Sequence, residues 1–372
     1  MLLLCGGRSA EHDVSLASAR SVLEAVGDSP RLEVVPLVIG RDGVALGPEA
    51  SARLLGTAPR ALPNGEAQRS CPDGDAPAGG GGPHGAGDGA AEAPADGPRE
   101  LARSLADAGG AFDVVFPLLH GPYGEDGSVQ GLLKVMGLPF VGSDVLGSAV
   151  AMDKLAMKAM FAAAGLPQVP YRGVTRAAFD ADPGAALAPA RELGTPVFVK
   201  PANLGSSIGV SRVDDPADLE AAVASALGHD RRAVVEAAAV GARELEVAVL
   251  GNDRPVASGV GEVRVRPGAR AFYDYEAKYT DGLADLIVPA DVPEEVAQAA
   301  RRMALDAFAA VDAAGLARVD LFYLPDGRLL VNEINTIPGF TRHSMYPRLW
   351  QAAGLSFPEL IERLVELALE RR

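Results

Sequence analysis

Apolar and polar positions follow two different periods along the first third of the chain. A short continuous apolar run at residues 2–5 ends at two glycines, and longer apolar runs occupy residues 32–39 and 112–119. Each run predicts a buried strand. Between the first two runs, apolar residues at 14–26 recur at helical spacing up to Gly27. Strand, helix and strand in this order predict an open α/β sheet with parallel strands.

Short strands and helices alternate in the rest of the pattern. Segments 318–324 and 328–334 alternate apolar and polar residues on either side of Pro325-Asp326-Gly327, which predicts a β-hairpin. The other elements are predicted from apolar spacing, with helices at 152–164, 216–227, 291–311 and 357–370, and strands at 196–200, 209–213, 233–236 and 245–250.

Residues 65–100 interrupt this pattern. The segment is rich in glycine, alanine and proline and contains no valine, isoleucine, leucine, methionine, phenylalanine, tyrosine or tryptophan. Such a segment cannot bury enough apolar surface to offset the entropy of ordering it. We therefore expect a disordered insertion in the first domain. The simpler interpretation is a tolerated surface insertion, and a regulatory role is the alternative.

Composition and charge narrow the class of protein. With 372 residues, of which 48% are hydrophobic and 22% charged, the chain is typical of a globular protein with two or three domains. The 49 acidic residues exceed the 34 lysines and arginines, which argues against a nucleic-acid or anionic-membrane partner. Cys5 and Cys71 have no metal or redox spacing. No signal peptide or membrane span is evident, so we expect a cytoplasmic protein.

The hairpin carries the most informative polar residues. Arg318 and Asp320 share one face of the first strand, and Glu333 and Asn335 share one face of the second. Folding at the turn brings Asp320 to within a residue or two of Glu333. Two carboxylates and an amide oxygen suit Mg²⁺, which also takes water and phosphate ligands. The alternative is a solvated acidic face on a surface hairpin.

Two loops contain further candidate residues. Lys200 ends a predicted strand, and the Gly/Ser loop 203–209 after it would bring backbone N–H groups and hydroxyls close to a phosphate. A plain Gly/Ser hairpin explains that loop equally well, and Lys154 and Lys278 are further cations unless they simply face solvent. His120 opens a glycine-rich loop after a buried strand, where open α/β sheets bind substrates, although a structural histidine is the alternative.

Seven segments, in this order along the chain, resemble the D-alanine:D-alanine ligases, which are enzymes of the ATP-grasp type. Only residues 65–100 lie clearly outside the match. The segments are GGRSAEHDVSL (6–16), HGPYGEDGSVQG (120–131), MDK (152–154), VKPANLGSSIGV (199–210), FYDYEAKY (272–279), ARVD (317–320) and NEINTIPGFTRHS (332–344).

The resemblance implies a three-domain ATP-grasp fold with an open α/β N-terminal domain. We expect domains at 1–142, which carries the insertion, at 143–239, and at 240–372, which carries the metal and catalytic residues. The implied reaction joins two D-alanine molecules through an acyl phosphate to give D-alanyl-D-alanine for peptidoglycan precursors, and forms ADP. The implied cofactors are ATP and two Mg²⁺ ions, for which Mn²⁺ substitutes. A homodimer is the expected assembly, without nucleic acid or membrane.

The resemblance also implies a role for each matched residue. The residues expected to bind ATP are Lys154, Lys200, Lys278, Ser206 and Ser207 at the phosphates, Glu236 at the adenine amino group and Glu244 at the ribose. The expected metal ligands are Asp320, Glu333 and Asn335. The expected catalytic residues are Glu11, Ser206, Tyr279, Arg318 and Gly339, the last two at the oxyanion. Glu11 and His120 would hold the first D-alanine, and Ser344 with the Met345 N–H the second.

One departure and two alternatives qualify this expectation. Ala237, Ala238 and Ala239 follow Glu236 where many relatives carry a lysine and a bulky apolar residue, so one side of the adenine pocket is weakened. A D-alanine:D-lactate or D-alanine:D-serine ligase is one alternative, and the loop from Tyr275 to Tyr279 favours the dipeptide-forming enzymes over it. The other is a nucleotide-binding regulator, which would not need the oxyanion donor Arg318.

Overall fold

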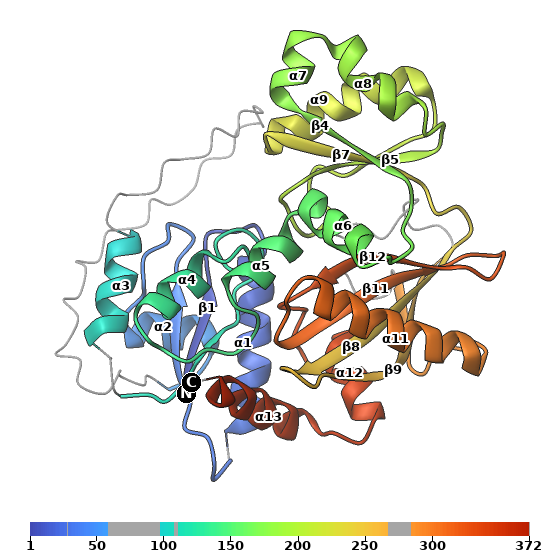
Figure 1. Cartoon of the computed structure of the whole chain (residues 1–372). Helices are drawn as coiled ribbons and strands as arrows, with labels where there is room; N and C mark the ends of the chain where they lie inside the picture. The colour runs from blue at the N-terminus through green and yellow to red at the C-terminus, as the bar shows by residue number, and fades with distance from the viewer. Residues whose placement is uncertain (28, 59–96, 108–110, 267–283, 372) are drawn as a thin grey trace.

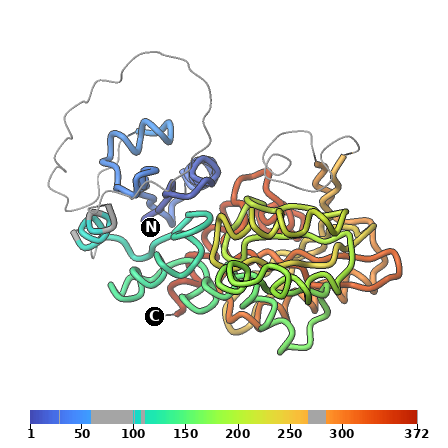
Figure 2. Tube along the Cα trace, turned by 90° about the horizontal axis from the view of Figure 1, so that it is seen from above, coloured from blue at the N-terminus to red at the C-terminus, as the bar shows by residue number. Residues whose placement is uncertain are grey.

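Three β-sheets organise the part of the chain that the computed structural model describes, residues 1–27, 29–58, 97–107, 111–266 and 284–371. Figure 1 shows the N-terminal region on the left, the central region at the top and the C-terminal region on the right. Viewed from above, the N-terminal region stands beside the other two, which lie one over the other (Figure 2).

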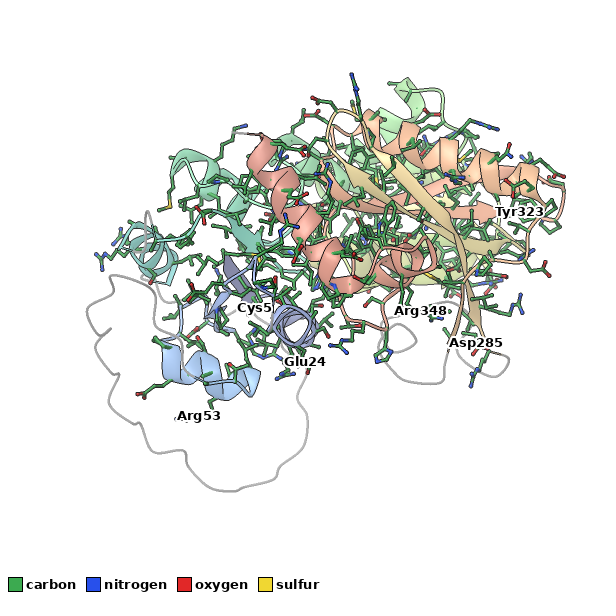
Figure 3. All side chains as sticks on the ribbon, turned by 90° about the horizontal axis from the view of Figure 1, so that it is seen from below. Cys5, Glu24, Arg53, Asp285, Tyr323 and Arg348 are labelled. Atoms are coloured by element: carbon green, nitrogen blue, oxygen red, sulfur yellow. The ribbon has the colours of Figure 1, made fainter. Side chains whose placement is uncertain are left out.

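The first sheet confirms the predicted parallel strands. Its order is β2-β1-β3, and both pairs are parallel. The apolar run of the sequence fills the middle strand, whose Leu2, Leu3, Leu4 and Cys5 are fully buried, and Cys5 lies among packed side chains in Figure 3. The elements of this region are β1 (Leu2–Gly6), α1 (His12–Val26), β2 (Val35–Ile39), α2 (Pro48–Leu55), α3 (Gly97–Asp107), β3 (Val115–Pro117) and α4 (Ser128–Val135).

Helix α3 corrects one boundary of the predicted insertion. The helix begins at Gly97, so residues 97–100 are helical rather than disordered. The reason is the apolar spacing just beyond them, because fully buried Leu105 packs into the cluster beside the first sheet and Leu101 packs against it. Residues 65–96 lie outside the described residues, and the prediction made for them stays a prediction.

The central sheet is antiparallel, in the order β4-β7-β5-β6. Helices α8 and α9 contribute its apolar cover, including Leu187 and Val223, which are fully buried. Its elements are β4 (Tyr171–Thr175), α7 (Arg176–Ala181), α8 (Pro183–Arg191), β5 (Val197–Pro201), β6 (Ser211–Val213), the 3-10 helix η1 (Pro216–Asp218), α9 (Leu219–His229) and β7 (Arg232–Ala237).

The third sheet, in the order β10-β9-β8-β11-β12, contains the predicted hairpin. Strands β11 and β12 pair antiparallel, with Asp320 directly opposite Glu333, so the predicted register is confirmed. The elements of this region are β8 (Arg243–Gly251), β9 (Val256–Val265), β10 (Ala284–Ile287), α11 (Glu294–Ala310), β11 (Gly315–Tyr323), β12 (Leu329–Asn335), α12 (Met345–Ala352) and α13 (Phe357–Glu370).

Packing crosses the expected domain boundaries at two places. Helices α5 (Val145–Met152) and α6 (Lys154–Ala163) contribute Ala151, Met157 and Phe161 to the apolar cluster of the third sheet. At the other end of the chain, α13 returns to the N-terminal region and shares a cluster with α1. The N-terminal region is therefore fixed to the C-terminal region by the last helix.

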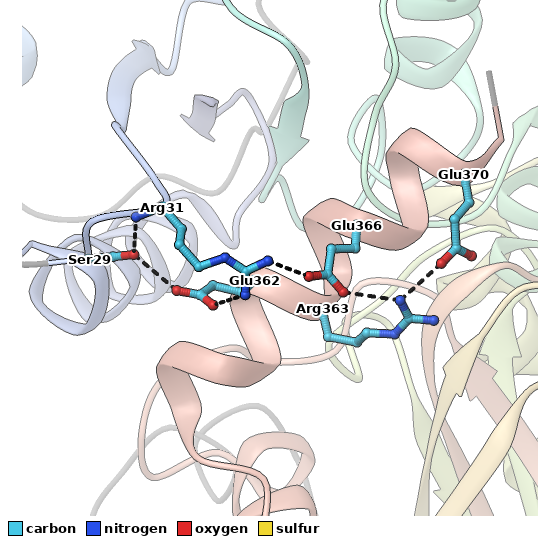
Figure 4. A network of polar contacts seen from close by, with 6 residues as sticks. All are labelled: Ser29, Arg31, Glu362, Arg363, Glu366 and Glu370. Atoms are coloured by element: carbon cyan, nitrogen blue, oxygen red, sulfur yellow. Dashed lines mark hydrogen bonds and ion pairs between the residues drawn. The ribbon is translucent and has the colours of Figure 1, made fainter.

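A polar network covers the edge of this interface between α13 and the N-terminal region (Figure 4). Arg31 forms ion pairs of 2.8 Å with both Glu362 and Glu366 of α13. Because Arg31 is 61% exposed, solvent screens both ion pairs and each contributes little to stability. The buried leucines of α13, among them Leu360 and Leu364, hold the helix in place.

Among the described residues, no helix combines the length and the apolar character that a membrane span requires.

Candidate active site

A cavity of about 600 Å³ lies between the central and C-terminal sheets and reaches the first loops of the N-terminal region. Thirteen residues expected at the site line it, although they come from all three regions of the chain. They are Glu11, His120, Lys154, Lys200, Ser206, Ser207, Glu236, Glu244, Arg318, Asp320, Glu333, Asn335 and Gly339.

Two more of the expected residues lie outside this lining. Ser344 and Met345 stand at the start of α12, behind Gly339; the Ser344 hydroxyl accepts from the Thr341 N–H at 3.1 Å. Lys278 and Tyr279 lie outside the described residues.

A row of carboxylates crosses the third sheet beneath the cavity. Asp320 is the direct cross-strand partner of Glu246 on β8 and of Glu333 on β12. The Arg318 guanidinium donates to both Asp320 oxygens at 2.7 Å, and its Nε also lies 3.1 Å from Glu246. These carboxylates outweigh the effect of burial and raise the pKa of Arg318 well above its usual value. Arg318 is therefore a fixed cation.

Asp320, Glu333 and Asn335 form a donor set that fits a magnesium ion. Asn335 donates its Nδ2 to Asp320 Oδ2 at 3.1 Å, which leaves its amide oxygen as an acceptor. Two carboxylates and one amide oxygen are few ligands, and Mg²⁺ usually completes such a set with waters and phosphate oxygens. Within the described ranges there is no group of three acidic, histidine or cysteine side chains that would hold a metal alone.

The Gly/Ser loop covers the other side of the cavity. Ser206 and Ser207 have positive φ angles of 51° and 57°, which is strained for residues other than glycine. The Ser206 hydroxyl donates to Glu11 of the N-terminal region, and the Lys154 amine binds the Leu204 carbonyl. The loop thus joins two regions of the chain over the cavity. Positive φ angles at two consecutive residues also occur in plain hairpin turns, so the contacts with Glu11 and Lys154 are what distinguish this loop from one.

Glu236 stands at the end of β7 between two lysines. Lys200 Nζ lies 2.7 Å from one of its oxygens, and Lys158 Nζ lies 3.1 Å from the other. Burial alone would raise the pKa of Glu236, but the two ammonium groups outweigh it and lower that pKa to about 2. Burial likewise acts against the charge of Lys200, yet Glu236 and Glu333 raise the pKa of Lys200 above its ordinary value. Glu236 is therefore ionised.

His120 and Glu11 form the end of the cavity nearest the N-terminal sheet. The His120 ring lies 3.1 Å from the Ile337 carbonyl and 3.4 Å from the Ser18 hydroxyl. Burial lowers the pKa of His120, and the nearby Glu11 carboxylate only partly offsets that effect. Close to neutral pH the ring is uncharged and serves as a hydrogen-bonding group.

The sequence predictions missed several cavity residues. Glu125 lies in the glycine-rich loop after His120, accepts from the Gly121 N–H at 2.5 Å, and has a pKa raised by burial and by Glu11. Glu246 was missed because only strand pairing places it beside Asp320. Lys158, which lies behind the cavity lining, was missed as well, although this lysine interrupts the apolar stripe of α6 one turn after Lys154.

Known proteins resemble the chain along its whole length. The family model described as D-ala D-ala ligase N-terminus matches residues 1–143, and the model described as D-ala D-ala ligase C-terminus matches residues 160–366. A curated D-alanine–D-alanine ligase of Deinococcus radiodurans is 49% identical over 374 residues, which cover 100% of this chain and 99% of the relative.

Solved structures resemble the chain as well. The D-alanine–D-alanine ligase of Coxiella burnetii superposes with a TM-score of 0.74 at 30% identity, over 100% of this chain and 93% of that one. The VanG D-Ala:D-Ser ligase of Enterococcus faecalis has a TM-score of 0.75 at 28% identity, over 99% of this chain and 98% of that one.

Proposed function

We propose, from the premise that this chain belongs to the D-alanine–D-alanine ligase family, that the cavity is where ATP activates one D-alanine for attack by another. The fold is the ATP-grasp fold, and the enzyme is a D-alanine–D-alanine ligase that makes D-alanyl-D-alanine for peptidoglycan precursors. The observation that carries the assignment of the site is the convergence of the expected ATP, metal and substrate residues of three regions on one cavity.

The chemistry requires activation because a carboxylate has no viable leaving group. Transfer of the γ-phosphoryl group to the carboxylate of the first D-alanine gives an acyl phosphate and ADP. The amine of the second D-alanine then attacks the acyl carbon, the peptide bond forms, and inorganic phosphate leaves. Such transfer depends mainly on positioning and charge neutralisation. Magnesium ions held by Asp320, Glu333 and Asn335 would neutralise phosphate charge, and Mn²⁺ would substitute for them.

The lysines and the Gly/Ser loop are proposed to bind the nucleotide. Lys154 and Lys200 supply fixed positive charge for the phosphates, and the Ser206 and Ser207 hydroxyls supply donors. Glu236, held as an anion, is suited to accept from the adenine amino group, and Glu244 from the ribose hydroxyls. These roles are supported by the common cavity and by the ion pairs of Lys200.

The amino acids are proposed to bind at the N-terminal end of the cavity. The Glu11 carboxylate matches the ammonium of the first D-alanine, with His120 near its carboxylate. Arg318 and the Gly339 N–H would stabilise the oxyanion of the tetrahedral intermediate. Ser344 and the Met345 N–H, at the start of α12, offer a helix N-terminus to the carboxylate of the second D-alanine. A role for Tyr279 and Lys278 rests on the sequence alone.

The competing functions are less well supported. One structural neighbour is a D-Ala:D-Ser ligase at 28% identity, whereas the 49% identical curated relative is a D-alanine–D-alanine ligase. A regulator without catalysis would not need Arg318 fixed between two carboxylates. We expect the protein to form a homodimer, which sedimentation analysis tests. We also expect it to act in the cytoplasm, where ATP is available.

One assay tests the proposal. Purified protein is expected to release phosphate from ATP only when D-alanine and Mg²⁺ are both present, and to form D-alanyl-D-alanine. D-serine and D-lactate, each supplied as the second substrate, separate the dipeptide ligase from the alternatives. Equal turnover with L-alanine, or turnover of ATP without any amino acid, contradicts the proposal.

A further inference from the structure

Lys158 is a fully buried lysine with no place in the reaction described above. Its side chain is 1% exposed, and its backbone belongs to α6, where Met157 and Phe161 join the apolar cluster of the third sheet. The ammonium meets two groups, the Glu236 carboxylate at 3.1 Å and the ring of Tyr171, whose centroid is 5.3 Å away. A lysine is almost never fully buried unless it is paired.

The two lysines of α6 have different surroundings. Lys154 and Lys158 are four residues apart and lie on one face of α6. Lys154 lines the cavity and binds the Leu204 carbonyl of the Gly/Ser loop, whereas Lys158 is not part of the lining. Lys158 therefore approaches Glu236 from behind the cavity wall, and cannot bind a ligand directly.

The charges around Glu236 indicate the effect that Lys158 has on this carboxylate. Its two oxygens face one ammonium each, Lys158 on one side and Lys200 on the other. Lys200 lines the cavity and is the cation that a nucleotide phosphate would engage. Once phosphate oxygens share Lys200, Lys158 is, among the residues that the structure describes, the one full counter-ion left for Glu236. A buried carboxylate without one would take up a proton and turn into a donor.

We propose that Lys158 is a positioning residue for the nucleotide, which holds Glu236 ionised and in place from behind, so that Glu236 accepts from the adenine amino group while Lys200 binds phosphate. The inference rests on the proposed function, because it assigns ATP to this cavity. An apolar side chain of similar length would fill the same space without the cost of burying a charge. A lysine at this position is thus explained by its effect on Glu236.

Replacement of Lys158 by methionine tests the inference. In the variant, Glu236 loses one of its two ion pairs and keeps the one with Lys200, so the KM for ATP is expected to rise about ten-fold, which corresponds to one charged hydrogen bond. The KM for D-alanine and kcat change less than about three-fold. The preference for ATP over inosine triphosphate falls at least about five-fold, because a protonated Glu236 donates to the purine carbonyl that replaces the amino group.

Two further comparisons separate positioning from a merely structural role. Phe161→Leu loosens the same apolar cluster without touching Glu236, and is expected to lower the melting temperature while leaving the KM for ATP and the base preference unchanged. In the Glu236→Gln background, Lys158→Met is expected to alter the KM for ATP less than about two-fold, since no carboxylate remains to be held. The double variant removes both charges and is expected to fold even where Lys158→Met does not.

The outcomes distinguish this inference from the proposed function. If the wild type shows no ATP turnover with D-alanine, the proposed function fails. If the wild type is active and folded Lys158→Met keeps its KM for ATP and its base preference, the inference is overturned. It is also overturned if Lys158→Met has the same effect on the KM for ATP in the Glu236→Gln background as alone.

Discussion

Replacement of Arg318 by lysine keeps a positive charge beneath the cavity but removes the planar fork of the guanidinium. In the wild type, two nitrogens of Arg318 donate to the two Asp320 oxygens at 2.7 Å, and Nε also lies 3.1 Å from Glu246. A lysine amine is a point charge on a flexible stem. It can donate to Asp320 or to a substrate oxygen, but it lacks the rigid fork that binds both Asp320 oxygens and fixes the direction of the remaining donors.

The size of the effect follows from the hydrogen bonds that the substitution removes. One oxyanion donor is worth about 2.7–4 kcal/mol, so kcat of Arg318→Lys is expected to fall about 10²–10³-fold. One of two charged hydrogen bonds to Asp320 disappears as well, at about 1.5–3 kcal/mol of folding free energy. The retained charge keeps the carboxylates paired, so the variant is expected to fold. Its melting temperature should drop by several degrees.

The assay is steady-state phosphate release at saturating ATP and D-alanine, with thermal unfolding of the same samples. Arg328→Lys is the matched control, because Arg328 and Asp326 form a similar pair two residues apart on the same hairpin, with Arg328 67% exposed at the turn. A surface pair of this kind contributes little to stability, and kcat should not change. If Arg318→Lys keeps kcat close to that of the control, Arg318 is not the oxyanion donor.

Four other substitutions or conditions probe the remaining parts of the site. Glu333→Gln is expected to lower kcat at least about 10²-fold at an unchanged melting temperature and to weaken Mn²⁺ binding measured by calorimetry; unaltered Mn²⁺ affinity would exclude it as a ligand. Replacement of residues 65–96 by a short Gly/Ser linker should leave kcat and the melting temperature nearly unchanged, whereas a large loss of activity would indicate a regulatory role. Because the pKa of Glu236 is lowered to about 2, its stabilising effect is present above the unfolded value of 4.5 and is lost as pH falls through 2. Urea titrations should therefore show the wild type losing about 3 kcal/mol more than Glu236→Gln between about pH 5 and pH 2, and equal losses would refute the ion pairs. Tyr279→Phe should gain D-lactate use, most at about pH 6, where the D-alanine amine is protonated and the hydroxyl of D-lactate is unaffected; an unchanged product ratio in competition assays would remove Tyr279 as the determinant.

The predictable part of the site is the part that local periodicity controls. Alternation along the hairpin decides that Arg318 and Asp320 share a face. The Pro-Asp-Gly turn brings Asp320 to within one residue of Glu333, and a β-bulge between Asp320 and Leu321 places the two residues directly opposite each other. The same reasoning locates the buried strand β1, because a short apolar run next to glycines has few other structures available to it. Both predictions need only neighbours in sequence or across one turn.

The missed residues depend on pairing between distant segments. Glu246 reaches Asp320 only because β8 pairs with β11, and the two strands are separated in sequence by β9, β10 and α11. The end of the predicted insertion was misplaced because Gly97 and Pro98 belong by composition to that segment, while the leucines that anchor α3 come later. Composition characterises a segment as a whole, so it cannot show that the last residues of a Gly/Pro-rich segment belong to the helix that follows.

Lys158 illustrates how a sequence feature gains meaning from the fold. Taken alone, a lysine in the apolar stripe of α6 is a local inconsistency, since a buried charge costs several kcal/mol. The fold supplies Glu236 opposite it, and Glu236 in turn would be costly without a cation. Each charge offsets the cost of burying the other, and the pair leaves Lys200 available to a ligand in the cavity. A conflict with the local pattern thus marks a position that the functional site requires.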